Sequence, residues 1–130
     1  MKRIILGLSL LLMLVQNGFA YTDAWFDKNI ANSTQDVDKF IWKCNKLANN
    51  YMNSGDVNIC LQALKLEKKI YPNATNVIAS LYLNTGLLYD ESVGDKLKAY
   101  EYYMKSAKLG NVDAQHNLNI MCKESPWACK

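Results

Sequence analysis

The residues best suited to chemistry in this chain are four cysteines and a single histidine: Cys44, Cys60, Cys122, Cys129 and His116. A thiol enzyme would need a free thiolate beside the imidazole, and we expect the four cysteines to be oxidised instead. A zinc site is not expected either, because there is no CxxC pair and only one histidine. In an exported chain an even number of cysteines indicates disulfides instead, and four cysteines allow three different pairings.

A short acidic stretch, "YDESVGD", contains three further candidate ligands, Asp90, Glu91 and Asp95. Carboxylates of this kind could hold a cation, but their spacing is not that of an EF-hand loop. A solvated loop is the simpler interpretation. The sequence therefore predicts no catalytic residues, no cofactor and no metal.

The first residues have the pattern of a secretory signal. Lys2 and Arg3 precede an apolar run over residues 4–15, and small residues follow at Gly18 and Ala20. This pattern predicts a signal peptide over residues 1–20, cleaved after Ala20. The apolar run is shorter than the roughly 20 residues that cross a bilayer comfortably. We therefore expect a periplasmic or secreted bacterial protein that is not inserted in the membrane after cleavage.

The charge balance argues against nucleic acid as a partner. The whole chain carries a formal charge of +3, and loss of Lys2 and Arg3 leaves +1. Nucleic-acid binding depends on concentrated positive charge that neutralises phosphates. The mature chain also has no arginine, so bidentate guanidinium contacts to phosphate or carboxylate are not available.

Helical periodicity dominates the chain after an irregular segment over residues 21–36. Apolar residues recur at three and four positions, and no run of alternating β-branched residues suggests a strand. The expected helices cover about residues 37–51, 60–70, 74–83, 96–109 and 112–123. Asp95 is the expected N-cap of the fourth helix, and Gly110 is expected to follow its C-terminus. The predicted fold class is all-α, with about five helices and residues 84–94 as a loop.

Two stretches of the chain repeat one another. "KLANNYMNSG" and "VIASLYLNTG" align without a gap, which brings Tyr51 onto Tyr82 and Gly55 onto Gly86. Repeated helix pairs predict a short α-solenoid of antiparallel hairpins. Small residues then mark the positions where helices cross closely: Ala48, Ala79, Ala99, Ala107 and Ala114.

One region carries small, apolar and aromatic residues in a fixed order: Ala74, Ile78-Ala79, Tyr82, Gly86, Asp95, Lys98-Ala99, Tyr102-Tyr103, Ser106-Ala107 and Gly110. This order resembles the Sel-one-like repeat, a relative of the tetratricopeptide repeat. Two features depart from the family: the loop before Asp95 is longer, and Ile-Ala replaces the usual Leu-Gly. The resemblance assigns residues 74–110 to one repeat and residues 111–130 to a capping helix and tail.

The preceding unit, residues 37–73, resembles a tetratricopeptide hairpin at Leu47, Ala48, Tyr51 and Pro72. In such a hairpin Cys44 and Cys60 would face each other, within the roughly 7 Å between Cα atoms that a disulfide allows. The resemblance therefore favours Cys44–Cys60, with Cys122–Cys129 joining the tail to the last helix.

Repeat solenoids of this kind resemble one another in exposing the first helix of each pair on a concave groove. Counting from the tyrosines, which are expected to point into the core, predicts a groove rich in asparagine. Its predicted residues are Trp42, Asn45, Asn49, Met52, Asn76, Ser80, Leu83, His116, Ile120 and Lys123.

These features together predict a non-enzymatic module that binds another protein. One specific alternative is an immunity protein that neutralises a secreted toxin of the type VI kind, since such proteins are small, exported and disulfide-bonded. A scaffold or regulator in the cell envelope would use the same groove. The competing class is a small exported enzyme, either a cell-wall hydrolase or a thiol-active protein.

Overall fold

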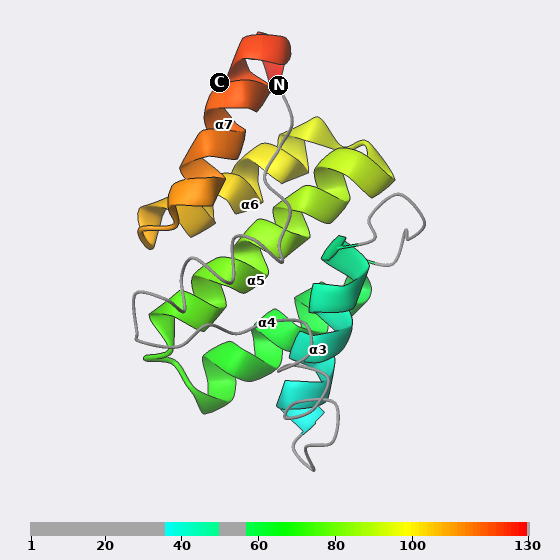
Figure 1. Cartoon of the computed structure of the whole chain (residues 1–130), viewed down its shortest axis with the longest axis vertical. Helices are drawn as coiled ribbons and strands as arrows, with labels where there is room; N and C mark the ends of the chain where they lie inside the picture. Colours follow the sequence, from blue (N-terminus) through cyan, green and yellow to red (C-terminus); the bar gives the residue numbers. More distant parts are fainter. Residues whose placement is uncertain (1–35, 50–56, 130) are drawn as a thin grey trace.

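The computed structural model describes residues 36–49 and 57–129 (Figure 1). Over these ranges the chain is all-α, as predicted, and contains no strand. The five α-helices are α3 (Asp36–Asn49), α4 (Asn58–Ile70), α5 (Thr75–Leu87), α6 (Lys96–Lys108) and α7 (Val112–Glu124). A π-helix, η2 (Leu88–Val93), extends α5, and a 3-10 turn, η3 (Pro126–Ala128), follows α7.

The helices stack in the order of the chain, as in a short α-solenoid. Each packs against the next, from cyan α3 to orange α7 in Figure 1, and α5 also contacts α3. Because α5 has neighbours on several sides, its burial is not confined to one stripe. Every residue from Ile78 to Asp90 is buried except Tyr82. None of the helices in the described ranges is long and apolar enough to span a membrane.

The small residues lie at the helix crossings, as predicted for four of the five alanines. Ala48, Ala79, Ala99 and Ala114 are at most 1% exposed, whereas Ala107 is only partly buried. Gly86 marks a close approach between α5 and α6. A Cβ atom at this position would lie 2.6 Å from Cδ1 of Tyr103, the large residue that fills the space between α5 and α6.

Both ends of α6 form as the sequence predicted. The side chain of Asp95 accepts a hydrogen bond from the Lys98 backbone N–H at 3.0 Å, which satisfies one of the unpaired donors of the first turn. At the other end Gly110 adopts a φ of 93°, a left-handed conformation that glycine tolerates without strain. The side chain of Asn111 then caps α7 through the Ala114 N–H at 2.8 Å.

The predicted loop over residues 84–94 is wrong. The helix that was expected to end at Leu83 continues to Leu87 and then widens into the π-helix, which ends at Val93 and is followed by Gly94 with a φ of 80°. The physical reason is burial. Leu87 and Leu88 are both 0% exposed and join the two apolar clusters of the core, which outweighs the turn signal of Asn84 and Gly86.

Both predicted disulfides are present. Cys44–Cys60 joins α3 to α4 with 4.8 Å between the Cα atoms, and both residues are fully buried. Cys122–Cys129 joins α7 to the tail with 5.6 Å between the Cα atoms. Since all four cysteines are paired, the chain has no thiol available as a nucleophile.

Candidate functional site: a tyrosine–lysine groove

The predicted concave groove is wrong for four of its ten residues. Asn45, Ser80, Leu83 and Ile120 are at most 3% exposed, so their side chains cannot line an open surface. The remaining predicted residues divide into three groups: Asn76, His116 and Lys123 are exposed, Trp42 and Asn49 are half-buried, and Met52 lies outside the described residues.

For Ser80 and Leu83 the error comes from the choice of reference residue. Tyr82 was expected to mark the centre of the core, but it is the one residue of the buried stretch of α5 that keeps partial exposure. Ser80 and Leu83 were assigned to the surface because they lie off the Tyr82 stripe, and both are therefore core residues. An amphipathic helix has one buried stripe, and α5 does not follow that rule because helices surround it.

A surface groove lies instead where α4 and α6 flank α5. It consists of two adjoining hollows, each with a volume of about 350 Å³, that share Lys68, Tyr82 and Lys105. We call it the tyrosine–lysine groove. Its lining residues are Leu61, Leu64, Lys65, Lys68, Pro72, Thr75, Ile78, Tyr82, Tyr102, Lys105, Lys108 and Leu109.

The lysines border the groove in two short rows. Lys65 and Lys68 lie three residues apart on α4, and Lys105 and Lys108 have the same spacing on α6. Side chains three residues apart on a helix are on the same face. Each row therefore points two ammonium groups toward the same groove, from opposite sides of α5.

Aromatic rings support the lysine side chains. The Tyr102 ring is stacked on Tyr89, with 5.5 Å between the ring centroids, and lies 6.1 Å from Tyr82. Lys105 Nζ lies 5.0 Å from the Tyr102 centroid, and Lys68 Nζ lies 5.9 Å from the Tyr82 centroid. Such cation–π contacts hold an ammonium group over a ring while its other side stays in water.

The groove has little acidic compensation. Its lining contains no aspartate or glutamate. An ion pair at its edge joins Lys105 Nζ to Glu101 Oε1 at 3.2 Å, and both side chains are exposed. An exposed pair of this kind is weak and is screened by salt. Burial raises the pKa of the Tyr102 hydroxyl, as does neighbouring Tyr89, so this ring stays neutral at physiological pH.

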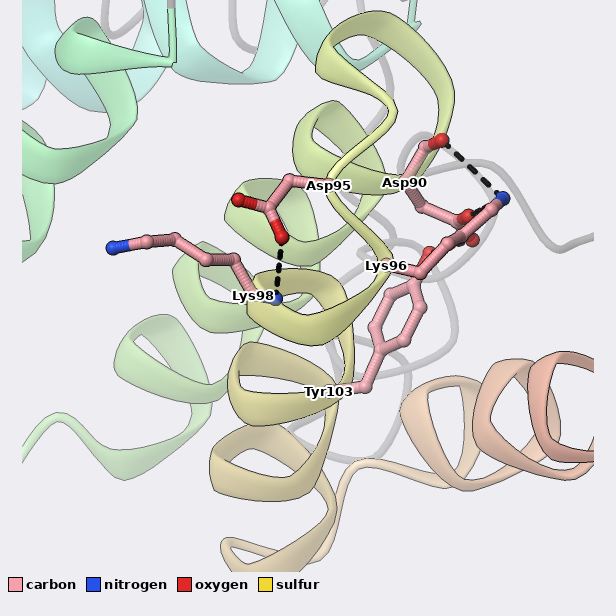
Figure 2. Close-up of polar contacts among 5 residues, drawn as sticks. All are labelled: Asp90, Asp95, Lys96, Lys98 and Tyr103. Atoms are coloured by element: carbon pink, nitrogen blue, oxygen red, sulfur yellow. Dashed lines mark hydrogen bonds and ion pairs between the residues drawn. The ribbon is translucent and has the colours of Figure 1, made fainter. Parts of the chain in front are cut away.

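The acidic stretch that was considered as a cation ligand set has a structural role in the described chain (Figure 2). Asp90 is 3% exposed. One carboxylate oxygen forms an ion pair with Lys96 Nζ, and the other accepts a hydrogen bond from the Tyr103 hydroxyl at 3.1 Å. Asp95 is the N-cap described above, and its side chain is not directed at Asp90 in this view.

Asp90 therefore ties the π-helix to α6, and its carboxylate is engaged by protein donors. No cluster of three or more metal-ligating side chains occurs in the described part of the chain.

A sequence signal for the tyrosine–lysine groove exists on α4. Leu61 and Leu64 are followed on the same face by Lys65 and Lys68, so an apolar stripe there gives way to charge. The tyrosines are predicted to point into the core, which gives no indication of a surface groove. The pairing of the two lysine rows depends on how closely α4 and α6 approach each other, and periodicity does not report that distance.

Comparison with known proteins does not assign the chain to a family: no family model, no curated protein and no solved structure matches it.

Proposed function

We propose that this chain is a non-enzymatic, exported module that binds a partner protein through the tyrosine–lysine groove. The observation that carries the proposal is the combination of an apolar and aromatic floor with four lysines at the rim of two adjoining, solvent-facing hollows. Large aromatic side chains with a polar border are typical of residues that concentrate binding energy at interfaces.

Two further observations support binding over catalysis. Every cysteine is in a disulfide, which gives no support to the thiol-active alternative. In the acidic stretch, the buried carboxylate of Asp90 is engaged by Lys96 and Tyr103. The resemblance to Sel-one-like repeats, which we retain as a hypothesis, agrees with a binding role.

Export is part of the proposal. Two disulfides fit an oxidising compartment, where such bonds form and persist. The signal peptide proposed for residues 1–20 would deliver the chain there, and in a bacterium that compartment is the periplasm or the exterior.

The test is capture of partners from a periplasmic extract by the tagged mature chain, quantified by mass spectrometry. The groove variant carries Lys68→Glu and Lys105→Glu, and the matched control carries Lys39→Glu and Lys43→Glu, two exposed lysines of α3. We expect a specific partner to be retained by the control and lost by the groove variant. Equal loss in both variants, or no loss in either, would contradict the proposal.

A third variant, His116→Ala with Lys123→Ala, tests the groove predicted from the sequence at two of its exposed residues. Trp42→Ala is less informative there, because Trp42 packs against the apolar core and its removal would also destabilise the fold. The identity of the partner then separates the alternatives: a toxin indicates an immunity protein, and an envelope protein indicates a scaffold.

A further inference from the structure

The charge of the tyrosine–lysine groove points to one class of partner. The groove carries four lysines and no acidic residue, whereas the whole chain has a formal charge of only +3. The rest of the chain is therefore at −1. Positive charge is concentrated at the groove, and a local concentration of one sign selects ligands of the opposite sign and speeds their association.

The floor of the groove adds a second requirement. Ile78, Pro72 and Leu109 form an apolar end, and Leu109 is 38% exposed. An ion alone would leave this surface in contact with water. Burying it requires an apolar side chain, so the ligand must combine carboxylates with at least one large hydrophobic residue.

The positions of the lysines define how such a ligand would lie. The row on α4 and the row on α6 face each other across Tyr82, which both Lys68 and Lys105 approach, at 5.9 and 5.8 Å from the ring centroid. A segment that follows α5 between the rows could place carboxylates on both of its sides and an apolar residue beneath. Lysine suits this role because its ammonium group is a mobile point charge that needs no fixed fork geometry.

We propose that the groove binds an acidic segment of a partner protein, anchored by an aromatic or aliphatic side chain in the hollow formed by Pro72, Ile78 and Leu109. The proposal rests on the function proposed above and specifies the chemistry of the partner. Its two requirements are separable, since carboxylates engage the lysine rows and the apolar anchor engages the floor.

The experiment uses the purified, oxidised mature chain and a short fluorescein-labelled peptide in which a Phe-Leu pair is flanked by glutamates. Fluorescence polarisation is measured at low and high salt. Two control peptides replace either all the glutamates by glutamine or the Phe-Leu pair by serine. We expect each control peptide to bind about tenfold more weakly or worse, and salt to weaken binding of the acidic peptide.

Variants of the protein locate the site. Lys68→Glu with Lys105→Glu is expected to lower the affinity for the acidic peptide at least tenfold. Lys39→Glu with Lys43→Glu is expected to change this affinity by no more than about twofold. Leu109→Ser is expected to lower the affinity for the acidic peptide that contains Phe-Leu. It should not change the affinity for the control peptide in which serine replaces that pair. Circular dichroism of each variant checks that the fold is intact.

Several results would overturn the proposal. Equal weakening by both charge-reversal pairs would show non-specific attraction. Heparin or anionic phospholipid vesicles could bind more strongly than the peptide, with the same dependence on Lys68 and Lys105. That result would show that the ligand is another polyanion and not a protein segment. If the chain is a dimer and Lys68→Glu with Lys105→Glu makes it a monomer, the groove is occupied by a second copy of this chain. If the captured partner is lost in the groove variant but the acidic peptide does not bind wild type, the proposed function stands and the acidic chemistry fails.

Discussion

Replacement of Gly86 by alanine tests whether close helix packing or helix propensity controls this position. Gly86 lies within α5, where alanine would normally gain up to about 1 kcal/mol over glycine. The added Cβ, however, would lie 2.6 Å from Cδ1 and 2.8 Å from Cε1 of Tyr103. Carbon atoms in contact are normally about 3.5–4.0 Å apart, so the ring would have to move by roughly 1 Å.

The ring has little freedom to move. Tyr103 is 0% exposed, and its hydroxyl donates a hydrogen bond to the buried carboxylate of Asp90 at 3.1 Å. Overpacking of a core costs about 1–3 kcal/mol, and a ring held at both ends places this site near the upper value. After the gain in propensity, Gly86→Ala should lower the free energy of unfolding by about 2 kcal/mol, which is roughly 10 °C in Tm.

Urea unfolding followed by circular dichroism measures this difference, and a double-mutant cycle identifies its cause. In a Tyr103→Leu background the ring is absent, so Gly86→Ala should be neutral or stabilise the protein by up to about 1 kcal/mol. The reasoning is refuted if Gly86→Ala stabilises the wild-type chain, or if its cost is the same in both backgrounds.

Three further outcomes are expected. Replacing Cys44 and Cys60 by alanine opens a link across a sequence separation of 16 and should cost about 3 kcal/mol in urea unfolding, more than loss of the tail disulfide, whose separation is 7. Burial and the nearby carboxylate of Asp38 raise the pKa of Glu67 from 4.5 to about 7. The folded state then binds more protons than the unfolded state between those values, so stability should fall as pH rises from about 4.5 to 7, and Glu67→Gln should flatten that slope in unfolding measured across this range. Ser106→Ala removes the buried hydrogen bond that its hydroxyl donates to a backbone carbonyl of α5 at 2.6 Å, and should cost about 1 kcal/mol in the same assay, an effect that an unchanged urea midpoint would contradict.

Prediction of the candidate site from sequence failed at a specific step. Apolar periodicity gives the buried face of a helix that has water on its other side, and for α4 this condition holds. On α3 the same counting placed Asn45 in the groove, although it is 1% exposed. The condition does not hold for α5, which has neighbours on several sides, and the interpretation of Ser80 and Leu83 as surface residues failed for that reason. The same central position let α5 continue through Gly86 to Leu87, where glycine and asparagine indicated a turn.

The sequence by itself determined the fold class, the order of the helices, the caps at Asp95 and Gly110, and the small residues at the crossings. These features depend on contacts between residues close in the chain or on a period that repeats along it. The disulfide pairing did not follow from the residues alone, which left three pairings open; the resemblance favoured the pairing that the structure contains.

Only the tertiary structure decided which surfaces are open. Lys65 and Lys68 on one helix, and Lys105 and Lys108 on another, become a single site because α5 brings α4 and α6 to its two sides. Exposure and charge concentration are properties of that three-dimensional arrangement. They depend on distances between segments far apart in the chain, which the spacing of residues along one helix does not contain.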